Sequence, residues 1–380
     1  MSIERHTHTP EFDQKPTVTE RKFLPLFPET LERYRQESRP IKQSYLSHPE
    51  EPFTLHFREK LGTDGALHYH AYMKDVGTLT EDGITRLEVS APIDERLYRY
   101  YESEGAPTIY KLRAEPRPGI AIDFHEDGTV QVESKDEAAW QDFTAEHGEH
   151  FVDTTGDSSS TNEWKAHLAF RQQNEGRETL QPLPELRADD IVNDILRQDN
   201  RSRVVHIGGR SGSGKSTIVR EVREKLERVG YRSVVMSTDD YHRGTSKLRE
   251  YNGGEVWTHW DDAIVYDTQT MAADLATLAS GGAIYRREID WSIAEPVFTG
   301  VIEPADIVIV EGIYAKSPDI VQSGSLVYEM PTPLATCIGR RLMRDMRERP
   351  EFADPAKNLG YMLQEAEPAY RAQQNGESGQ

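Results

Sequence analysis

A glycine-rich run in the second half of the sequence has the residue types and spacing of a phosphate-binding loop. Residues 209–216 read G-R-S-G-S-G-K-S and follow the apolar stretch 204–207, which is typical of a buried strand. Glycines let successive backbone N–H groups surround phosphate oxygens, and a lysine opening the next helix neutralises the β- and γ-phosphates. The alternative is a glycine-rich turn that arose by chance. Such a turn would not be expected to precede a helix, whereas apolar residues recur here at helical spacing over 218–226. The sequence therefore predicts a nucleoside triphosphate site with Mg²⁺ on the Ser216 hydroxyl. The residues expected to bind the nucleotide are Gly209, Arg210, Ser211, Gly212, Ser213, Gly214, Lys215, Ser216 and Thr217.

Carboxylates end two further apolar stretches that we predict to be strands. Asp239 and Asp240 follow the stretch 233–238, and Glu311 follows the stretch 307–310. In a parallel α/β sheet the carboxyl ends of the strands converge on the ligand crevice, so these acids are expected beside the phosphates. An acid near a hydroxyl can take its proton, and an acid near Mg²⁺ can orient the water shell of the metal. This arrangement indicates phosphoryl transfer, with simple helix capping as the alternative for any one acid.

These motifs resemble the uridine kinase and phosphoribulokinase family over about residues 202–371. The family elements D-S-[FY]-[YH]-[RK], H-P-x-A-F-D, P-A-D-[VI]-[VIL]-x-x-E-G-[IL] and R-R-x-x-R-D-x-x-E-R have counterparts in the same order as the phosphate loop. The counterparts are residues 239–243, residues 260–263 with Asp267, residues 304–313 and residues 340–349. The resemblance implies a P-loop α/β fold with a parallel sheet, and a kinase that uses ATP and Mg²⁺.

The resemblance also assigns roles to individual residues. It implies that Asp239 is the general base for the acceptor hydroxyl, that Lys215 binds the phosphates and that Glu311 supports the magnesium, with Asp240 as a further metal ligand. Arg341 and Arg344 would clamp the phosphates, since a planar guanidinium can spread over oxygens that gain charge in the transition state. A solvated helix face with ion pairs at i,i+4 spacing is the alternative for each arginine.

The sequence departs from the family pattern at the acceptor side. Asp261 stands where the H-P-x-A-F-D element has its proline, and residues 285–291 read Y-R-R-E-I-D-W in place of the stretch that faces sugar and base in uridine kinases. The identity of the acceptor is therefore left open, within the class of nucleoside-like or sugar-phosphate-like hydroxyl compounds.

The length, charge and composition of the whole chain limit the number of domains and the classes of partner that we expect. A chain of 380 residues predicts two domains, with the boundary where 174–177 and 182–184 interrupt any periodic pattern. We place a barrel domain at 16–172, a linker and leading helix at 173–200, and the kinase-like domain at 201–372. A net charge of −20 argues against a nucleic-acid partner, and the single Cys337 excludes an internal disulfide. No apolar run approaches membrane-spanning length, and we predict a cytoplasmic protein.

The first half of the chain alternates between apolar and charged residues in short segments, as in 53–58 and 121–124. This pattern predicts antiparallel β-structure, in which every second side chain lies on the same face. Glu20 therefore shares a face with Lys22, and Lys111 shares one with Arg113. In an open sheet this charged face would be the solvated side, whereas in a closed barrel it would form a cationic lumen suited to polyphosphate.

The order of motifs in this half resembles the CYTH, or triphosphate tunnel metalloenzyme, family over about residues 18–171. The matching segments are 19–24, 41–46, Lys74, 86–88, 111–113, Asp123 and 153–157. The resemblance implies a tunnel-like antiparallel β-barrel with two sets of functional residues. Triphosphate would be bound by Lys22, Arg58, Lys74, Arg86, Lys111 and Arg113, and metal would be held weakly by Glu20, Glu88 and Glu133.

The acidic set of this resemblance is incomplete. Val18, Ser90 and Gln131 occupy positions where the pattern has acids. Hard divalent cations need several oxygen ligands, so we expect these replacements to weaken metal binding more than anion binding.

Together these features predict an ATP-dependent small-molecule kinase joined to a barrel that binds inorganic polyphosphate or another phosphate-rich ligand. Two other functions stay open at this point. One is a Mg²⁺-dependent pyrophosphatase or triphosphatase. The other is a nucleotide-gated switch whose barrel senses phosphate. The sequence does not give the oligomeric state.

Overall fold

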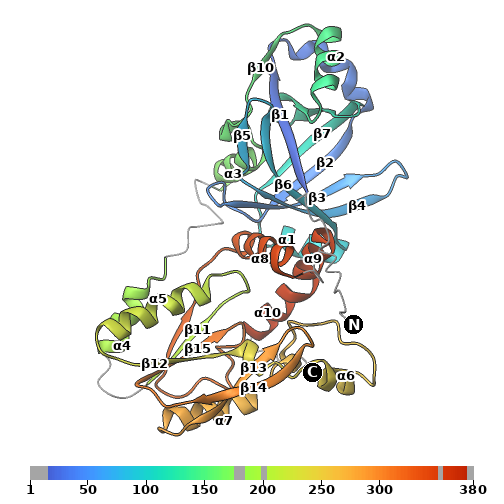
Figure 1. Cartoon of the computed structure of the whole chain (residues 1–380). Coiled ribbons are helices and arrows are strands. Elements are labelled where there is room, and N and C mark those ends of the chain that lie inside the picture. The colour runs from blue at the N-terminus through green and yellow to red at the C-terminus, as the bar shows by residue number, and fades with distance from the viewer. Residues whose placement is uncertain (1–15, 175–184, 198–202, 350–353, 375–380) are drawn as a thin grey trace, which may run out of the picture. The chain divides into compact units, whose positions relative to one another are not determined.

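The computed structural model describes residues 16–174, 185–197, 203–349 and 354–374 (Figure 1). The chain divides into two compact units, residues 1–180 and residues 181–380. The predicted two-domain organisation is confirmed. Residues 175–184 and 198–200 of the predicted linker lie outside the described residues.

The first unit is an antiparallel barrel of eight strands. Its strands pair in the order β1-β9-β8-β7-β2-β3-β4-β6, and pairing of β6 with β1 closes the sheet on itself. Val18 on β1 lies opposite Arg86 on β6 at this closure. The barrel strands are β1 (Thr17–Pro25), β2 (Arg39–Tyr45), β3 (Phe53–Leu61), β4 (Leu67–Asp75), β6 (Gly83–Pro92), β7 (Thr108–Arg117), β8 (Ile120–His125) and β9 (Val130–Ser134). The short strands β5 (Thr78–Thr80) and β10 (Phe151–Asp153) pair with β6 and β1.

Helices cover the outer face of the barrel, where every second strand residue is apolar. They are α1 (Glu95–Ser103), α2 (Glu137–His147), α3 (Asn162–Gln173) and two 3-10 segments, Pro28–Glu37 and Ser158–Ser160. The side chains of Asp94, Asp136 and Thr161 cap the three α-helices by accepting backbone N–H groups. Phe23 of β1 stacks on Trp140 of α2 with ring centroids 3.7 Å apart. Because the apolar face packs outward, the charged face of each strand is turned into the barrel.

The second unit is built on a parallel sheet of four strands in the order β12-β15-β11-β16. The strands are β11 (Val204–Gly208), β12 (Ser233–Ser237), β15 (Ile307–Gly312) and β16 (Leu326–Glu329). Helices α4 (Ala188–Arg197) and α5 (Lys215–Arg228) pack on one face, and α7 (Thr268–Ala279) packs on the other. The predicted α/β fold with a parallel sheet is confirmed, and α4 belongs to the core of this unit.

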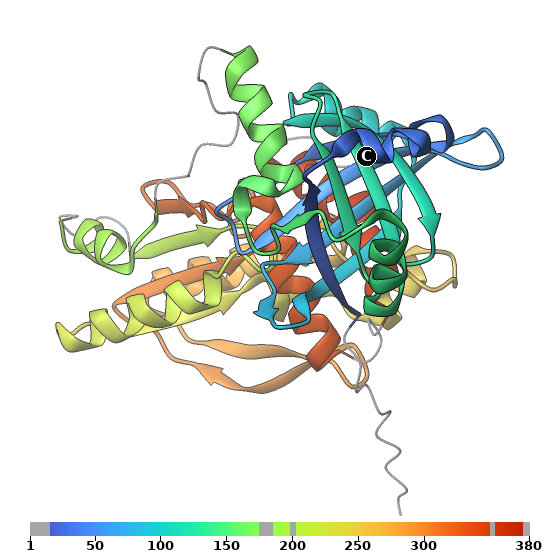
Figure 2. The same cartoon turned by 90° about the horizontal axis from the view of Figure 1, so that it is seen from above.

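The remaining elements of this unit surround the carboxyl ends of the strands. They are the 3-10 segments Thr238–Tyr241 and Ala263–Val265, α6 (Thr245–Tyr251), α8 (Leu334–Glu348), α9 (Pro355–Tyr361), the π-helical turn Met362–Ala366 and α10 (Glu367–Gln374). A separate antiparallel ribbon, β13 (Ile284–Asp290) with β14 (Glu295–Ile302), is drawn in orange in Figure 2. Among the helices in the described part of the chain we find none with the length and apolar character of a membrane span.

Candidate active site

The phosphate loop connects β11 to α5 and lies against α8. Gly212 and Gly214 have φ values of 81° and 95°, which favour glycine. A Cβ atom on Gly212 would lie 2.2 Å from the carbonyl oxygen of Cys337 on α8. The glycine at this position therefore serves both the turn and the close approach of the loop to α8. Thr332, which precedes α8, donates its hydroxyl to the Ser213 carbonyl at 2.7 Å.

Lys215 is the first residue of α5, and its side chain folds back over the loop. Its Nζ donates to the carbonyl oxygens of Gly209 and Arg210, both at 2.8 Å. Burial lowers the pKa of Lys215, and the nearby carboxylates of Glu311 and Asp239 oppose that shift. The amine is therefore held at the centre of the loop by backbone oxygens, within the electrostatic reach of both acids.

A cavity of about 800 Å³ joins the phosphate loop to the two predicted acids. Ser211, Lys215 and Ser216 line one part of it, and Asp239 and Glu311 line another. Glu311 accepts the Ser237 hydroxyl at 2.8 Å, and burial raises the pKa of Glu311. Asp239 is exposed to the cavity, where a bound hydroxyl could reach it.

Asp240, the next residue, is not among the residues that line this cavity. Burial raises the pKa of Asp240 to about 6, and the charges of Asp239, Glu288 and Glu311 add to that shift. The two neighbouring acids therefore differ: Asp239 is exposed and lines the cavity, whereas Asp240 is half-buried, does not line it and lies within the electrostatic reach of Glu288 on β13.

Three arginines complete the wall of the cavity: Arg341 in the middle of α8, Arg344 in its second half and Arg349 directly after its end. Arg344 donates to Asp345 at 2.8 and 3.0 Å, and Arg349 lies 3.8 Å from the same carboxylate. Arg341 is buried and forms a bidentate pair with Asp261. Both arginines predicted to clamp the phosphates thus face the cavity, and both have carboxylate partners that the sequence did not predict.

Aromatic side chains form the end of the cavity beyond Asp239. His242 lies near-parallel to Trp260 at 6.0 Å and edge-on to Trp291 at 5.8 Å. Tyr266 also lines this end, and the guanidinium of Arg349 lies 5.6 Å from the Trp291 ring centroid. These residues were missed by sequence reasoning, although Trp260 and Trp291 fall in the two segments that depart from the family pattern.

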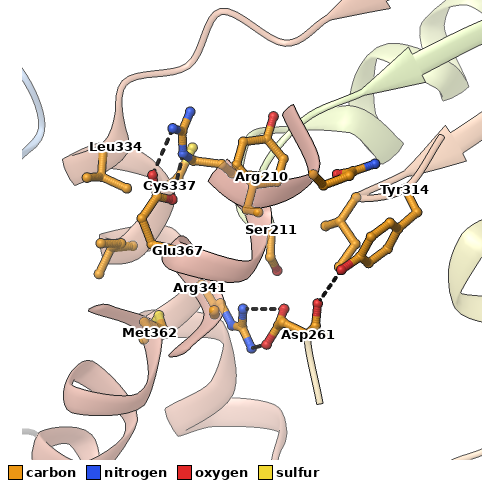
Figure 3. Close-up of a pocket in the computed structure, with 14 residues that line it drawn as sticks. Arg210, Ser211, Asp261, Tyr314, Leu334, Cys337, Arg341, Met362 and Glu367 are labelled. Atoms are coloured by element: carbon orange, nitrogen blue, oxygen red, sulfur yellow. Dashed lines mark hydrogen bonds and ion pairs between the residues drawn. The ribbon is translucent and has the colours of Figure 1, made fainter. Parts of the chain in front are cut away.

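The loop residue Arg210 points away from this cavity, towards α10. It forms a bidentate ion pair with Glu367 at 2.8 and 2.9 Å and lies over the ring of Tyr370 (Figure 3). Glu367 also accepts from Arg371 at 2.7 Å. The Arg210 side chain therefore contacts α10 and does not line the cavity that contains Lys215.

The cavity offers oxygen ligands of the kind that Mg²⁺ prefers. The Ser216 hydroxyl and the carboxylates of Asp239 and Glu311 line the same space. Within the described residues there is no group of three or more His, Cys, Asp or Glu side chains placed to hold a metal. Ser216, Asp239 and Glu311 would suit an ion that is bound by few protein oxygens and completes its coordination with phosphate oxygens and water, as Mg²⁺ does.

In the first unit, the predicted cations and acids meet each other inside the barrel. Lys74 pairs with Glu88 at 2.7 Å, Arg86 pairs with Glu20, and Arg113 reaches both Asp123 at 2.7 Å and Glu133 at 2.8 Å. Lys111 is buried against Asp123 at 2.6 Å, and burial lowers the pKa of Lys111 to about 7. The structure therefore places each of the three predicted metal ligands, Glu20, Glu88 and Glu133, in an ion pair.

Several polar atoms inside the barrel nevertheless lack a hydrogen-bond partner among the described residues. They include the Nε atoms of Arg58 and Arg86, Oε2 of Glu20 and both ring nitrogens of His56. His56 is stacked on Tyr72 with an interplanar angle of 4°, and burial keeps the pKa of His56 well below its usual value. Buried polar groups are normally satisfied, so these atoms mark a place where water or a polar ligand belongs.

Comparisons with known proteins agree with the geometry of the second unit. The model of the phosphoribulokinase / uridine kinase family matches residues 204–357. A uridine kinase of Staphylococcus haemolyticus is 30% identical over 148 residues, covering 38% of this chain and 70% of that protein. One of Clostridium perfringens is 32% identical over 148 residues, covering 38% of this chain and 69% of that protein. The chain belongs to the phosphoribulokinase / uridine kinase family, and its second unit is a P-loop kinase domain.

A solved structure is also similar to the first unit. The inorganic triphosphatase NE1496 aligns with 39% of this chain and 93% of its own, at 23% identity and a TM-score of 0.25. The barrel itself is established by the strand pairings of this chain. The tunnel-like fold that the first-half motifs implied is confirmed at the level of architecture.

Proposed function

We propose that the protein transfers the γ-phosphoryl group of ATP to a hydroxyl of a small molecule of the nucleoside-like or sugar-phosphate-like class. The observation that carries this proposal is the single cavity that joins the phosphate loop, Asp239 and Glu311. A hydroxyl beside Asp239 would lie between the general base and the phosphates, as in-line transfer requires.

Each part of the cavity then has a role in the reaction. Lys215 and the loop N–H groups bind the phosphates, and Arg341 and Arg344 face the oxygens that gain charge during transfer. Asp239 takes the proton of the acceptor hydroxyl as the new oxygen–phosphorus bond forms and ADP leaves. Ser216 and Glu311 would hold Mg²⁺, which neutralises phosphate charge when bound.

The proposal is tested by a screen of acceptors with the full chain. Nucleosides, pentose phosphates and other alcohols are incubated with ATP and Mg²⁺, and products are identified by mass. We expect a phosphate ester of one acceptor class together with stoichiometric ADP. Phosphate release that does not depend on any acceptor would instead favour the pyrophosphatase or triphosphatase. Nucleotide binding without turnover would favour the nucleotide-gated switch.

For the barrel we propose that it binds a polyphosphate, such as tripolyphosphate or the phosphates of a nucleotide, without requiring a metal. The buried N–H groups of Arg58 and Arg86 that find no partner among the described side chains support this. Because Glu20, Glu88 and Glu133 are each ion paired, a metal would have to compete with a fixed guanidinium or ammonium group for every ligand.

Binding is measured on the full chain carrying Lys215→Ala, so that the kinase cavity does not contribute. Titration with tripolyphosphate should show an affinity that falls roughly 10-fold in Arg58→Gln, about the effect of one charge-assisted hydrogen bond. Chelating divalent metal should change the affinity little. The matched control is Arg96→Gln, on the exposed surface of α1, which should bind as before. Loss of binding on chelation would overturn the metal-independent site.

A further inference from the structure

The interior of the barrel holds a histidine that is buried without hydrogen bonds on its ring. His56 is 3% exposed, and neither its Nδ1 nor its Nε2 bonds to any of the described residues. It lies on β3 between Tyr45 of β2 and Tyr72 of β4, which are its partners in the sheet. The centroids of the Tyr45 and Tyr72 rings lie 5.1 and 5.0 Å from that of the imidazole. Because both faces of the imidazole are covered, a ligand can meet only the edge that carries the nitrogens.

The strongest charge effects on His56 come from four cations inside the barrel. They lie on β3, β4, β6 and β7 and are Arg58, Lys74, Arg86 and Lys111. Three of them are ion paired, Lys74 with Glu88, Arg86 with Glu20 and Lys111 with Asp123. Burial, and after it these cations, nevertheless keep the pKa of His56 well below its usual value. The imidazole is therefore neutral at neutral pH in the free protein.

Other titratable side chains near this ring respond differently to pH. Burial raises the pKa of Tyr45, which stays uncharged, and lowers the pKa of His70, which flanks Tyr72. The carboxylate of Glu163 on α3 acts on Tyr45, and burial raises the pKa of Glu163 to about 7. Glu163 therefore already holds its proton at about pH 6, so that a proton taken up there on ligand binding belongs to another group.

A polyphosphate would reverse the balance at the His56 ring. A neutral imidazole has one N–H donor and one acceptor nitrogen, and that acceptor would face the lone pairs of a phosphate oxygen. A protonated imidazole has two donors, and both can form charge-assisted hydrogen bonds to phosphate oxygens. The negative charge of the ligand also offsets the cations that oppose protonation of the ring. Both effects favour the imidazolium in the complex.

We propose that the barrel binds polyphosphate together with one proton, which His56 takes up from solvent. This inference deepens the proposed binding of polyphosphate by the barrel and rests on it. A purely structural role would explain the stacking of His56, but it would leave a buried donor and a buried acceptor unsatisfied. Because the complex holds the extra proton, binding is strongest at low pH and weakens as the pH rises and the proton is lost.

The first test counts the protons. Tripolyphosphate is titrated calorimetrically into the full chain carrying Lys215→Ala, at about pH 6 with a chelator, in two buffers of different ionisation enthalpy. The difference in heat between the buffers gives the number of protons taken up. We expect about one proton more in this protein than in the same protein carrying His56→Gln, since glutamine does not titrate. Protonation of the ligand itself contributes to both proteins. Equal proton numbers would overturn the proposal.

The second test follows the affinity for tripolyphosphate from about pH 6 to about pH 8. For each pH unit, the affinity of the Lys215→Ala protein should fall up to about 10-fold more than that of the His56→Gln variant, as expected when one proton is linked to binding. The matched control is His150→Gln, at an exposed position directly before β10, which should follow the Lys215→Ala protein. Parallel pH profiles with and without His56→Gln would contradict proton uptake by His56.

The third measurement does not require that the His56→Gln variant folds. In the full chain with ¹⁵N-labelled histidine rings, neutral and protonated imidazoles differ in their nitrogen chemical shifts. The ring in contact with Tyr45 and Tyr72 should be neutral at about pH 6 and become protonated when tripolyphosphate is added. Binding without this change would overturn proton uptake by His56 and leave the polyphosphate site standing. If tripolyphosphate does not bind, the proposed function of the barrel fails together with this inference.

Discussion

The two units gather positive charge in different ways. Inside the barrel, Lys74, Lys111 and Arg113 are paired with fixed carboxylates at 2.6–2.8 Å. In the kinase cavity, Lys215 is held by two backbone carbonyl oxygens, beside a loop whose glycines expose backbone N–H groups. A polyanion entering the barrel must compete with carboxylates, whereas phosphates entering the loop displace only neutral oxygens. This difference fits the proposal that the loop takes part in phosphoryl transfer and that the barrel binds without chemistry.

The largest effect is expected at the loop lysine. Lys215→Ala should reduce phosphoryl transfer roughly 10³- to 10⁵-fold, because a buried cation on the phosphates is lost. Steady-state turnover of the full chain is the measurement. Lys225→Ala, on the same helix and paired with Asp189, is the matched control and should retain full activity. If Lys215→Ala and Lys225→Ala transferred phosphoryl groups at the same rate, the phosphate loop would have no role in the reaction.

The next effect separates two neighbouring carboxylates. Asp239→Asn should lower kcat roughly 10²- to 10⁴-fold while ATP still binds, since a positioned base is removed. Asp240→Asn should cost less than about 10-fold, because Asp240 does not line the cavity. ATP affinity and kcat are measured for each variant. A large defect in Asp240→Asn alone would mean that the roles are exchanged.

A third prediction concerns a partly buried carboxyl group of the barrel unit, that of Glu163. Glu163 of α3 accepts the Ser47 and Thr54 hydroxyls, and burial raises the pKa of Glu163 to about 7. Because this pKa is raised, the folded state binds the extra proton, and the stabilisation is lost as pH rises from 5 to 8. The loss should be about 1–2 kcal/mol, less than the full shift implies because the side chain is partly exposed.

Hydrogen exchange of the β2 and β3 amides in the full chain, corrected for intrinsic rates, measures this loss in the barrel alone. The Glu163→Gln variant should have a flatter pH profile than the unmodified protein over the same range. Identical profiles for the two proteins would show that Glu163 does not titrate there.

The smallest effect tests why the barrel should not be catalytic. Val18→Glu adds a carboxylate on the inward face of β1, beside the closure with Arg86. In the Lys215→Ala background it should raise Mg²⁺-dependent release of phosphate from tripolyphosphate by only a few-fold, since one more ligand still leaves the metal site sparse. Rapid Mg²⁺-dependent hydrolysis of tripolyphosphate by the Lys215→Ala protein without Val18→Glu would contradict the proposal that the barrel binds polyphosphate without hydrolysing it.

Features that depend on local sequence could be predicted, and features that depend on distant partners could not. The phosphate loop follows from one strand, one glycine-rich turn and one helix, and the charged interior follows from the parity of each strand. The partners of those charges depend on register and tertiary packing. Asp261 and Arg341 are 80 positions apart, and Arg210 and Glu367 are 157 apart. The aromatic end of the cavity was missed for the same reason.

The most direct measurement follows the γ-phosphate of labelled ATP in a single turnover with excess full-length protein and a mixture of acceptor alcohols. We predict that the label appears in an organic phosphate ester, that free phosphate forms only slowly, and that Lys215→Ala produces neither. Release of the label as inorganic phosphate, at the same rate with and without acceptors, would contradict phosphoryl transfer as the function of this chain.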